Sequence, residues 1–146
     1  MTLEETSESA TPNAEDIVRT ALNTVRSDIS VLRVVDYAVV VDTGRRYSDG
    51  SPVTARVWIP PSTPAMVAVG DGGSTYTRVG MFGNAPDYVL SVRRELMEHL
   101  PVRDIRGQVV ITAKSTRTAE AISLLADSCV ALDVAVIVAN HLRPKV

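Results

Sequence analysis

Two glycine- and charge-rich segments contain the residue types that could bind a ligand. The first, Gly70-Asp71-Gly72-Gly73, has the composition of a loop that cradles a phosphate. It lacks the Lys-Ser/Thr pair of a nucleotide-binding loop, and strand-forming residues follow it. We therefore predict a tight turn between two strands, at glycines that tolerate a positive φ. We do not expect a helix N-terminus to face an anion here.

The second segment is a loop with two arginines, a tyrosine and an acid. Arg45, Arg46, Tyr47 and Asp49 lie between two runs of β-branched residues. Guanidinium groups in such a loop can make paired hydrogen bonds to carboxylates or phosphates. The segment is a candidate partner-binding loop; the alternative is a solvated loop whose arginines have no role.

The residues that most often perform catalysis or bind metals are too scattered to form a motif. His99 and His141 have no ligand spacing to a second His or Cys, and both are expected at helix ends. Cys129 is the one cysteine and lies in an apolar run, so we interpret it as core filler. No serine lies in a nucleophile-elbow pattern, and neither Lys114 nor Lys145 follows an acid by two positions. We predict a protein that is not an enzyme and needs no metal or cofactor.

Composition limits the class of protein further. The chain has 146 residues, 45% of them apolar and only 4% aromatic, which suits one domain with an aliphatic core. Its net charge is −2, but residues 1–16 hold five of the 17 acids and no Lys or Arg. The remainder is only mildly basic, unlike a dedicated nucleic-acid binder. No uninterrupted apolar run reaches the about 18 residues of a membrane span. We expect a cytoplasmic protein with no membrane partner.

The elements that must position these residues begin after an N-terminal tail. We predict that residues 1–12 form a disordered acidic tail and that residues 13–146 form a single domain. Asn13 can cap a first helix that ends near Asp28. Strands are then expected over residues 31–35, 37–41, 53–59, 65–69 and 75–79.

The strand over residues 53–59 shows the clearest alternation. Val53, Ala55 and Val57 should face one side, and Arg56 and Trp58 the other. A tryptophan opposite the apolar register is either covered by a helix or offered to a partner. If it is offered, the face with Arg56 and Trp58 and the loop from Arg45 to Asp49 would form one partner-binding surface.

The second half of the chain predicts a helix, a hairpin and a final helix. The helix should run over residues 84–100, with Val89, Val92, Leu96 and Leu100 as its apolar stripe. The hairpin turn should lie at Arg106-Gly107. The last helix should start at Ser115 or Thr116. Its apolar stripe should consist of Ile122, Leu125, Cys129, Leu132 and Val136. Residues 133–139 are expected to continue the helix, with a strand as the alternative. The layout is a two-layer α+β fold, a mainly antiparallel sheet with helices packed on one face. This order of elements is similar to that of type III secretion chaperones.

The polar signature of residues 46–83 resembles a small bacterial and phage family described only as domain of unknown function eighteen twenty-eight. In that family an arginine-and-aspartate loop leads into an alternating strand and then into a short Asp-Gly turn. The matching residues here are Arg46, Asp49, the strand over 53–59, Asp71, Gly72, Thr75 and Gly83. The resemblance extends to about residue 135. It implies a small accessory protein, often of phage or mobile-element origin, without an assigned reaction.

Three hypotheses about function follow. The first is a protein-binding accessory domain that modulates or inhibits a host protein, such as a defence protein. The second is a nucleic-acid-associated module that uses surface arginines: Arg45, Arg46, Arg93, Arg94, Arg103 and Arg106. Its binding would weaken steeply with salt. The third is a chaperone-like homodimer with a large exposed apolar groove.

Overall fold

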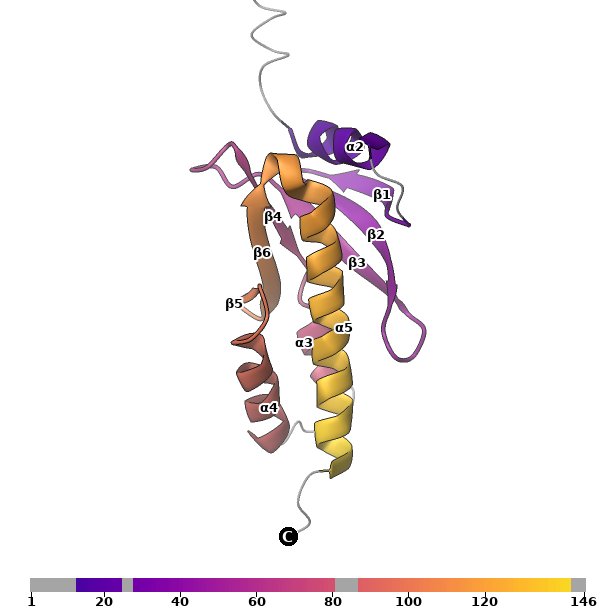
Figure 1. Cartoon of the computed structure of the whole chain (residues 1–146), viewed down its shortest axis with the longest axis vertical. Coiled ribbons are helices and arrows are strands. Elements are labelled where there is room, and N and C mark those ends of the chain that lie inside the picture. Colours follow the sequence, from indigo (N-terminus) through magenta and orange to yellow (C-terminus); the bar gives the residue numbers. More distant parts are fainter. Residues whose placement is uncertain (1–12, 25–27, 81–86, 143–146) are drawn as a thin grey trace, which may run out of the picture.

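A computed structural model describes residues 13–24, 28–80 and 87–142, and Figure 1 shows their arrangement. Within these residues one antiparallel six-stranded sheet is packed against helices, which confirms the α+β prediction. The predicted tail, residues 1–12, lies outside the described residues. The elements in chain order are α2 (Ala14–Thr24), β1 (Ser30–Val35), β2 (Ala38–Arg46), β3 (Pro52–Trp58), β4 (Met66–Gly70), α3 (Ser74–Gly80), α4 (Asp87–Met97), β5 (Arg103–Ile105), β6 (Gln108–Lys114), a 3₁₀ turn (Ser115–Arg117) and α5 (Thr118–Leu142).

The strand order in the sheet is β1-β2-β3-β4-β6-β5. At its centre Val57 of β3 pairs with Val39 of β2 on one side and with Val69 of β4 on the other. All three valines are at most 1% exposed and face the core. The predicted alternation of β3 is therefore confirmed. Arg106 and Gly107, both with positive φ, form the predicted turn between β5 and β6.

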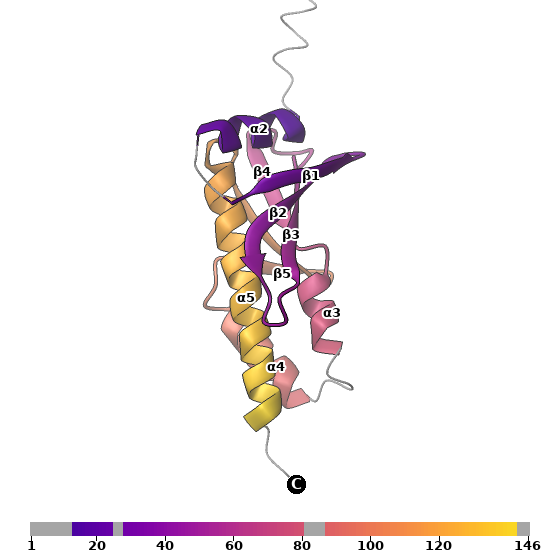
Figure 2. The same ribbon diagram turned by 90° about the vertical axis from the view of Figure 1, so that its right-hand side faces the viewer.

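The core lies between the sheet and α5. This helix runs along one face of the sheet and contacts β2, β3, β4 and β6, as Figures 1 and 2 show. Its predicted apolar stripe is confirmed, because Ile122, Leu125, Cys129 and Leu132 are 0% exposed. Residues 133–139 continue the helix, as expected, rather than forming a strand.

Helix α2 begins where Asn13 predicts it. The Asn13 side-chain oxygen accepts a hydrogen bond from the backbone N–H of Asp16 at 2.8 Å, and its amide donates to the Asp16 carboxylate at 2.7 Å. The described part of α2 ends at Thr24 and Asp28 lies in a bend before β1, so the predicted end near Asp28 falls on residues 25–27, outside the described residues. Val18 is the most deeply buried residue of α2 and anchors it to the core.

The expected strand over residues 75–79 was wrong, and so was the hairpin turn before it. Residues Ser74–Gly80 form helix α3. The Asp71 carboxylate caps this helix, accepting hydrogen bonds from the N–H groups of Gly73 at 2.8 Å and Thr75 at 2.9 Å. Side-chain capping of the first turn overrides the strand preference of Thr, Tyr and Val.

Helix α5, with the 3₁₀ turn before it, is the one segment of the described residues that is long and apolar enough to cross a membrane. The segment Ser115–Leu142 has a hydropathy of 2.1 over its most apolar window, but half of that window is buried inside the fold. The buried side chains of this window belong to the hydrophobic core. Asp127 and Asp133 interrupt the run, which is why no continuous apolar stretch of span length occurs in the sequence.

Candidate functional site

The loop between β2 and β3 is held against α3 and α5 by a buried network of charged residues. Asp133 of α5 is at its centre, with a side chain 1% exposed. Its carboxylate accepts hydrogen bonds from Arg78 Nε at 2.8 Å and Nη2 at 3.2 Å. It also accepts from the Ser48 hydroxyl at 2.9 Å and the Ser48 N–H at 3.2 Å. All the donors come from outside α5, so one carboxylate joins three segments.

Arg78 extends this network to the loop. Its Nη1 lies 3.1 Å from the Asp49 carboxylate, and its guanidinium carbon lies 4.2 Å from the centre of the Tyr47 ring. The hydrogen bonds to Asp133, and then those to Asp49, raise the Arg78 pKa. The hydroxyl and N–H of Ser51, followed by Arg78, hold the pKa of Asp49 well below its usual range. Every charge in the cluster is paired, which is the pattern of a structural anchor.

The Asp71 turn is also satisfied internally. Besides capping α3, the Asp71 carboxylate accepts the N–H of Val109 in β6 at 3.0 Å, and the residue is only 4% exposed. It therefore occupies the position that a phosphate would need. The loop from Asp71 to Gly73 is a joint between β4, β6 and α3.

The structure separates the residues predicted to bind a partner. Tyr47 is 5% exposed, and its hydroxyl hydrogen-bonds to the Ser74 and Thr75 hydroxyls, so it does not lie on the surface expected for it. Burial raises the Tyr47 pKa, which keeps the phenol protonated. Arg45 pairs with Asp127 of α5 at 2.8 Å. Arg46 donates to the Gly50 carbonyl at 3.1 Å.

Arg56 and Trp58 are not close to that loop. Arg46 pairs with Pro52 at one end of β3, whereas Trp58 pairs with Ala38 at the other end. At about 3.3 Å per residue, the two ends are about 20 Å apart. Trp58 lies half-buried on the face of the sheet opposite α5, between Ala38 and Ala68. The single contiguous surface expected from the sequence was therefore wrong.

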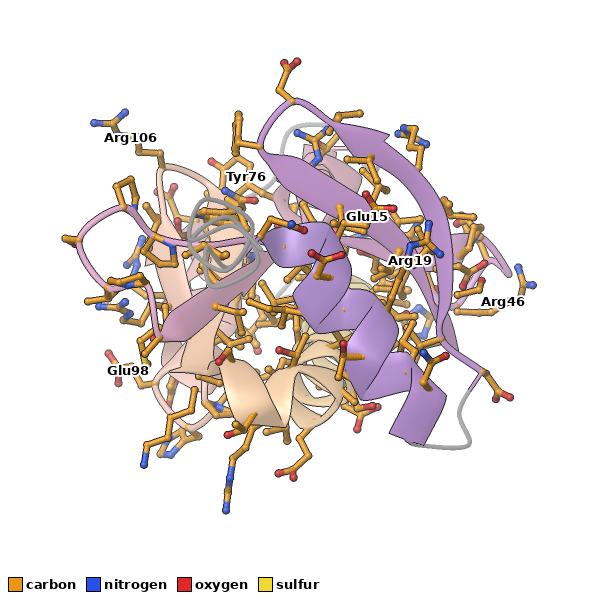
Figure 3. The ribbon with its side chains drawn as sticks, turned by 90° about the horizontal axis from the view of Figure 1, so that it is seen from above. Glu15, Arg19, Arg46, Tyr76, Glu98 and Arg106 are labelled. Atoms are coloured by element: carbon orange, nitrogen blue, oxygen red, sulfur yellow. The ribbon has the colours of Figure 1, made fainter. Side chains whose placement is uncertain are left out.

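The six arginines of the nucleic-acid hypothesis do not all lie on one face either. Arg93 is 4% exposed, which sequence reasoning missed. Arg46 and Arg106 lie on opposite sides of the molecule when it is viewed along its long axis (Figure 3). Arg94 and Arg103 line a pocket together with the buried Arg93.

Two concave surfaces flank α4. The first is this arginine pocket, of about 520 Å³, which lies between α4 and the segment leading into β5. The second is an apolar groove of about 580 Å³ between α4 and the C-terminal half of α5. We call it the α4–α5 groove; it is lined by Tyr88, Val92, Ala131, Val134, Ala135, Val138, Ala139 and Leu142.

The described residues contain no group of three or more His, Cys, Asp or Glu side chains that could hold a metal ion. His99 follows α4 and His141 lies in the last turn of α5, as their positions predicted. Burial raises the pKa of the Cys129 thiol to about 12, so at neutral pH it stays protonated and unreactive.

No family model, no curated protein and no solved structure matches this chain. The geometry of the described residues defines an α+β fold with a buried charged anchor and two concave surfaces beside α4. The family resemblance remains a prediction from the polar signature. Several residues of that signature, including Asp49, Asp71 and Thr75, hydrogen-bond within the anchor or the turn beside it.

Proposed function

We propose that the chain is a non-enzymatic protein-binding domain and that the α4–α5 groove is its binding surface. The main support for this proposal is the exposed apolar face of the groove. Tyr88 and Val134 are each 45% exposed, Val138 is 49% exposed and Leu142 is 66% exposed. Large apolar side chains gathered on a soluble domain are typical of an interaction surface.

The shape of the groove favours a helical segment of another protein as the occupant. Val134, Val138 and Leu142 recur every fourth residue, so they form one ridge along α5. Ala131 and Ala135 form a low strip beside that ridge. An amphipathic helix fits such a groove with apolar residues at matching spacing.

A second copy of the chain fits the groove less well. A twofold interface brings the same patch of each copy together. Two concave grooves facing each other would leave space between them unless both helices moved. The protein-binding hypothesis is therefore preferred to the chaperone-like dimer, and the modulation of a host protein is one role that such binding could serve.

A photo-crosslinking amino acid at position 138 tests the proposal in cells that express the chain. The matched control is the same group at Leu124, which lies on the same helix, is 46% exposed and is outside the groove. We expect a protein adduct at 138 that is absent at 124. The purified partner should then bind the wild-type chain and the Leu124→Glu variant alike.

For the same partner, Val138→Glu should weaken binding by about 100-fold, because a charge is forced into an apolar contact. The melting temperature should be unchanged, since Val138 is half exposed. A partner whose affinity does not respond to Val138→Glu, or no adduct specific to position 138, would overturn the proposal. An adduct between two copies would replace it with the dimer hypothesis.

A further inference from the structure

Arg93 is a buried cation whose hydrogen bonds are incomplete. It lies on the inward stripe of α4 with Val89 and Met97, spaced four residues apart, rather than on the solvent face. Its side chain is 5% exposed. Removing a guanidinium group from water is costly, and buried cations are normally paired in full.

The pairing that Arg93 does have is weak. Its Nη1 lies 3.4 Å from the Asp104 carboxylate. That is longer than the about 2.7–2.9 Å of a strong charge-assisted hydrogen bond. The ring of Tyr76 lies over the guanidinium with its centre 5.2 Å away. Nε and Nη2 are buried and have no hydrogen-bond partner within the described part of the chain.

The geometry of the two unpaired nitrogens indicates which kind of ligand could accept their hydrogen bonds. Nε and Nη2 lie on one edge of the planar guanidinium, and their N–H bonds match the two oxygens of a carboxylate or phosphate. The pocket that Arg93 lines has room for more than an oxyanion, at about 520 Å³. Its apolar part comes from Leu90, Met97 and Val102.

The charges around the pocket select among oxyanions. Arg93, Arg94 and Arg103 supply three positive charges, and Glu98 and Asp104 oppose two of them. The lining therefore balances one negative charge, which fits a monocarboxylate better than a phosphate dianion. We propose that this pocket binds the carboxylate of a ligand with an apolar body, through Nε and Nη2 of Arg93.

Asp104 controls entry to this site. Its side chain is 41% exposed, so it can swing into solvent and leave the guanidinium to a ligand. Tyr76, which is 48% exposed, covers the guanidinium and can stack on a flat ligand once displaced. In the described structure Asp104 lies near Nη1 and competes for the charge of the guanidinium, while Nε and Nη2 are left for the ligand carboxylate.

Titration by NMR with benzoate at fixed ionic strength tests the proposal, with acetate and inorganic phosphate as comparison probes. We expect saturable benzoate binding with shifts confined to α3, α4 and β5, and weaker binding of acetate and phosphate. Arg93→Gln should lower benzoate affinity at least about tenfold, whereas Arg45→Gln, a control with an arginine outside the pocket, should not.

Asp104→Asn keeps the test decisive if Arg93→Gln does not fold. The asparagine can still accept the N–H of Gly107, which Asp104 accepts at 2.9 Å, so the hairpin turn is retained. Losing the competing charge should raise benzoate affinity about threefold to tenfold. The proposal is overturned by an absence of saturable binding in both wild type and Asp104→Asn, or by equal losses in Arg93→Gln and Arg45→Gln. Tighter binding of phosphate than of benzoate would also overturn the choice of a carboxylate.

Discussion

Arg78 is the residue on which the packing of the β2–β3 loop depends. It meets Asp49 of the loop and Asp133 of α5, and it lies under the Tyr47 ring. Its side chain is 11% exposed, so water compensates little if either carboxylate is lost. Removing one partner of a buried pair leaves an uncompensated charge, which costs more than the pair contributes.

Asp133→Asn should therefore destabilise the domain strongly. The change leaves Arg78 buried and without its main counter-charge, so we expect a loss of about 3–5 kcal/mol in the free energy of unfolding. Urea denaturation measures it. Asp127→Asn is the matched control on the same helix, because its pair with Arg45 is exposed and contributes about 0–1 kcal/mol. Equal losses in the two variants would contradict the special role of Asp133.

The pKa of Asp49 gives the loop a predictable dependence on pH. Because folding lowers this pKa, the stabilisation is present above the ordinary value of 3.8 and is lost as pH falls below it towards the folded-state pKa. Asp49→Asn should thus be less stable than the wild type at pH 7, with a gap that narrows below pH 3.8. Unfolding curves at a series of pH values measure the gap. A gap independent of pH would show that the charge of Asp49 does not matter.

At the scale of elements, the sequence predicted what depends on hydrophobic periodicity. The alternation of β3 and the stripe of α5 from Ile122 to Val136 are regular, and the structure confirms both. Helix α3 was missed because its cap, Asp71, also bonds to Val109 of β6, a tertiary contact that no local pattern reveals. Sequence-based reasoning also treated Arg93 as a surface residue.

A signal for Arg93 existed in its spacing, four residues from both Val89 and Met97. The expected stripe of Val89, Val92, Leu96 and Leu100 shares only Val89 with this spacing. Its other three residues are only partly buried, and Leu100 lies beyond the end of α4. A similar signal marks Asp133, an acid within the apolar C-terminal helix. In both cases the position of a charged residue within a buried stripe indicates that it makes an internal contact. The sequence does not show which residue it contacts: Arg78 for Asp133 and Asp104 for Arg93.

Trp58 covers part of the face of the sheet opposite α5. Its ring lies against Gly70, where a Cβ atom would come within 3.2 Å of it, and its neighbours across the strands are Ala38 and Ala68. Both alanines are 3% exposed, so larger side chains such as Trp58 must shield them.

Trp58→Ala should therefore lower the free energy of unfolding by about 2 kcal/mol, roughly half the cost of truncating a fully buried aromatic residue. Urea denaturation followed by circular dichroism measures this, since the variant lacks the only tryptophan. Trp58→Phe, which keeps a ring over the alanines, should lose less. Unchanged stability in Trp58→Ala would mean that the ring is free surface, and would restore it as a partner-binding candidate.

At the scale of the whole molecule, two groups of exposed apolar residues lie on elements at opposite ends. Figure 1 shows β1 at one end of the long axis and the C-terminal half of α5 with α4 at the other. Strand β1 is an edge strand, and its Leu32 and Val34 are 49% and 48% exposed. The α4–α5 groove is concave, whereas the edge of β1 presents unpaired backbone groups that can pair with another strand.

This difference predicts how the isolated chain associates with itself. A strand edge can pair with the same edge of a second copy, so we expect concentration-dependent self-association through β1 rather than through the groove. Leu32→Lys should abolish it, because charge on an edge strand opposes pairing, and Val138→Glu should leave it unchanged. Sedimentation velocity over a range of concentrations distinguishes these outcomes. If Val138→Glu alone gave a monomer, the groove would be the homodimer interface. The chain would then need its second copy, rather than a partner helix, to cover α5.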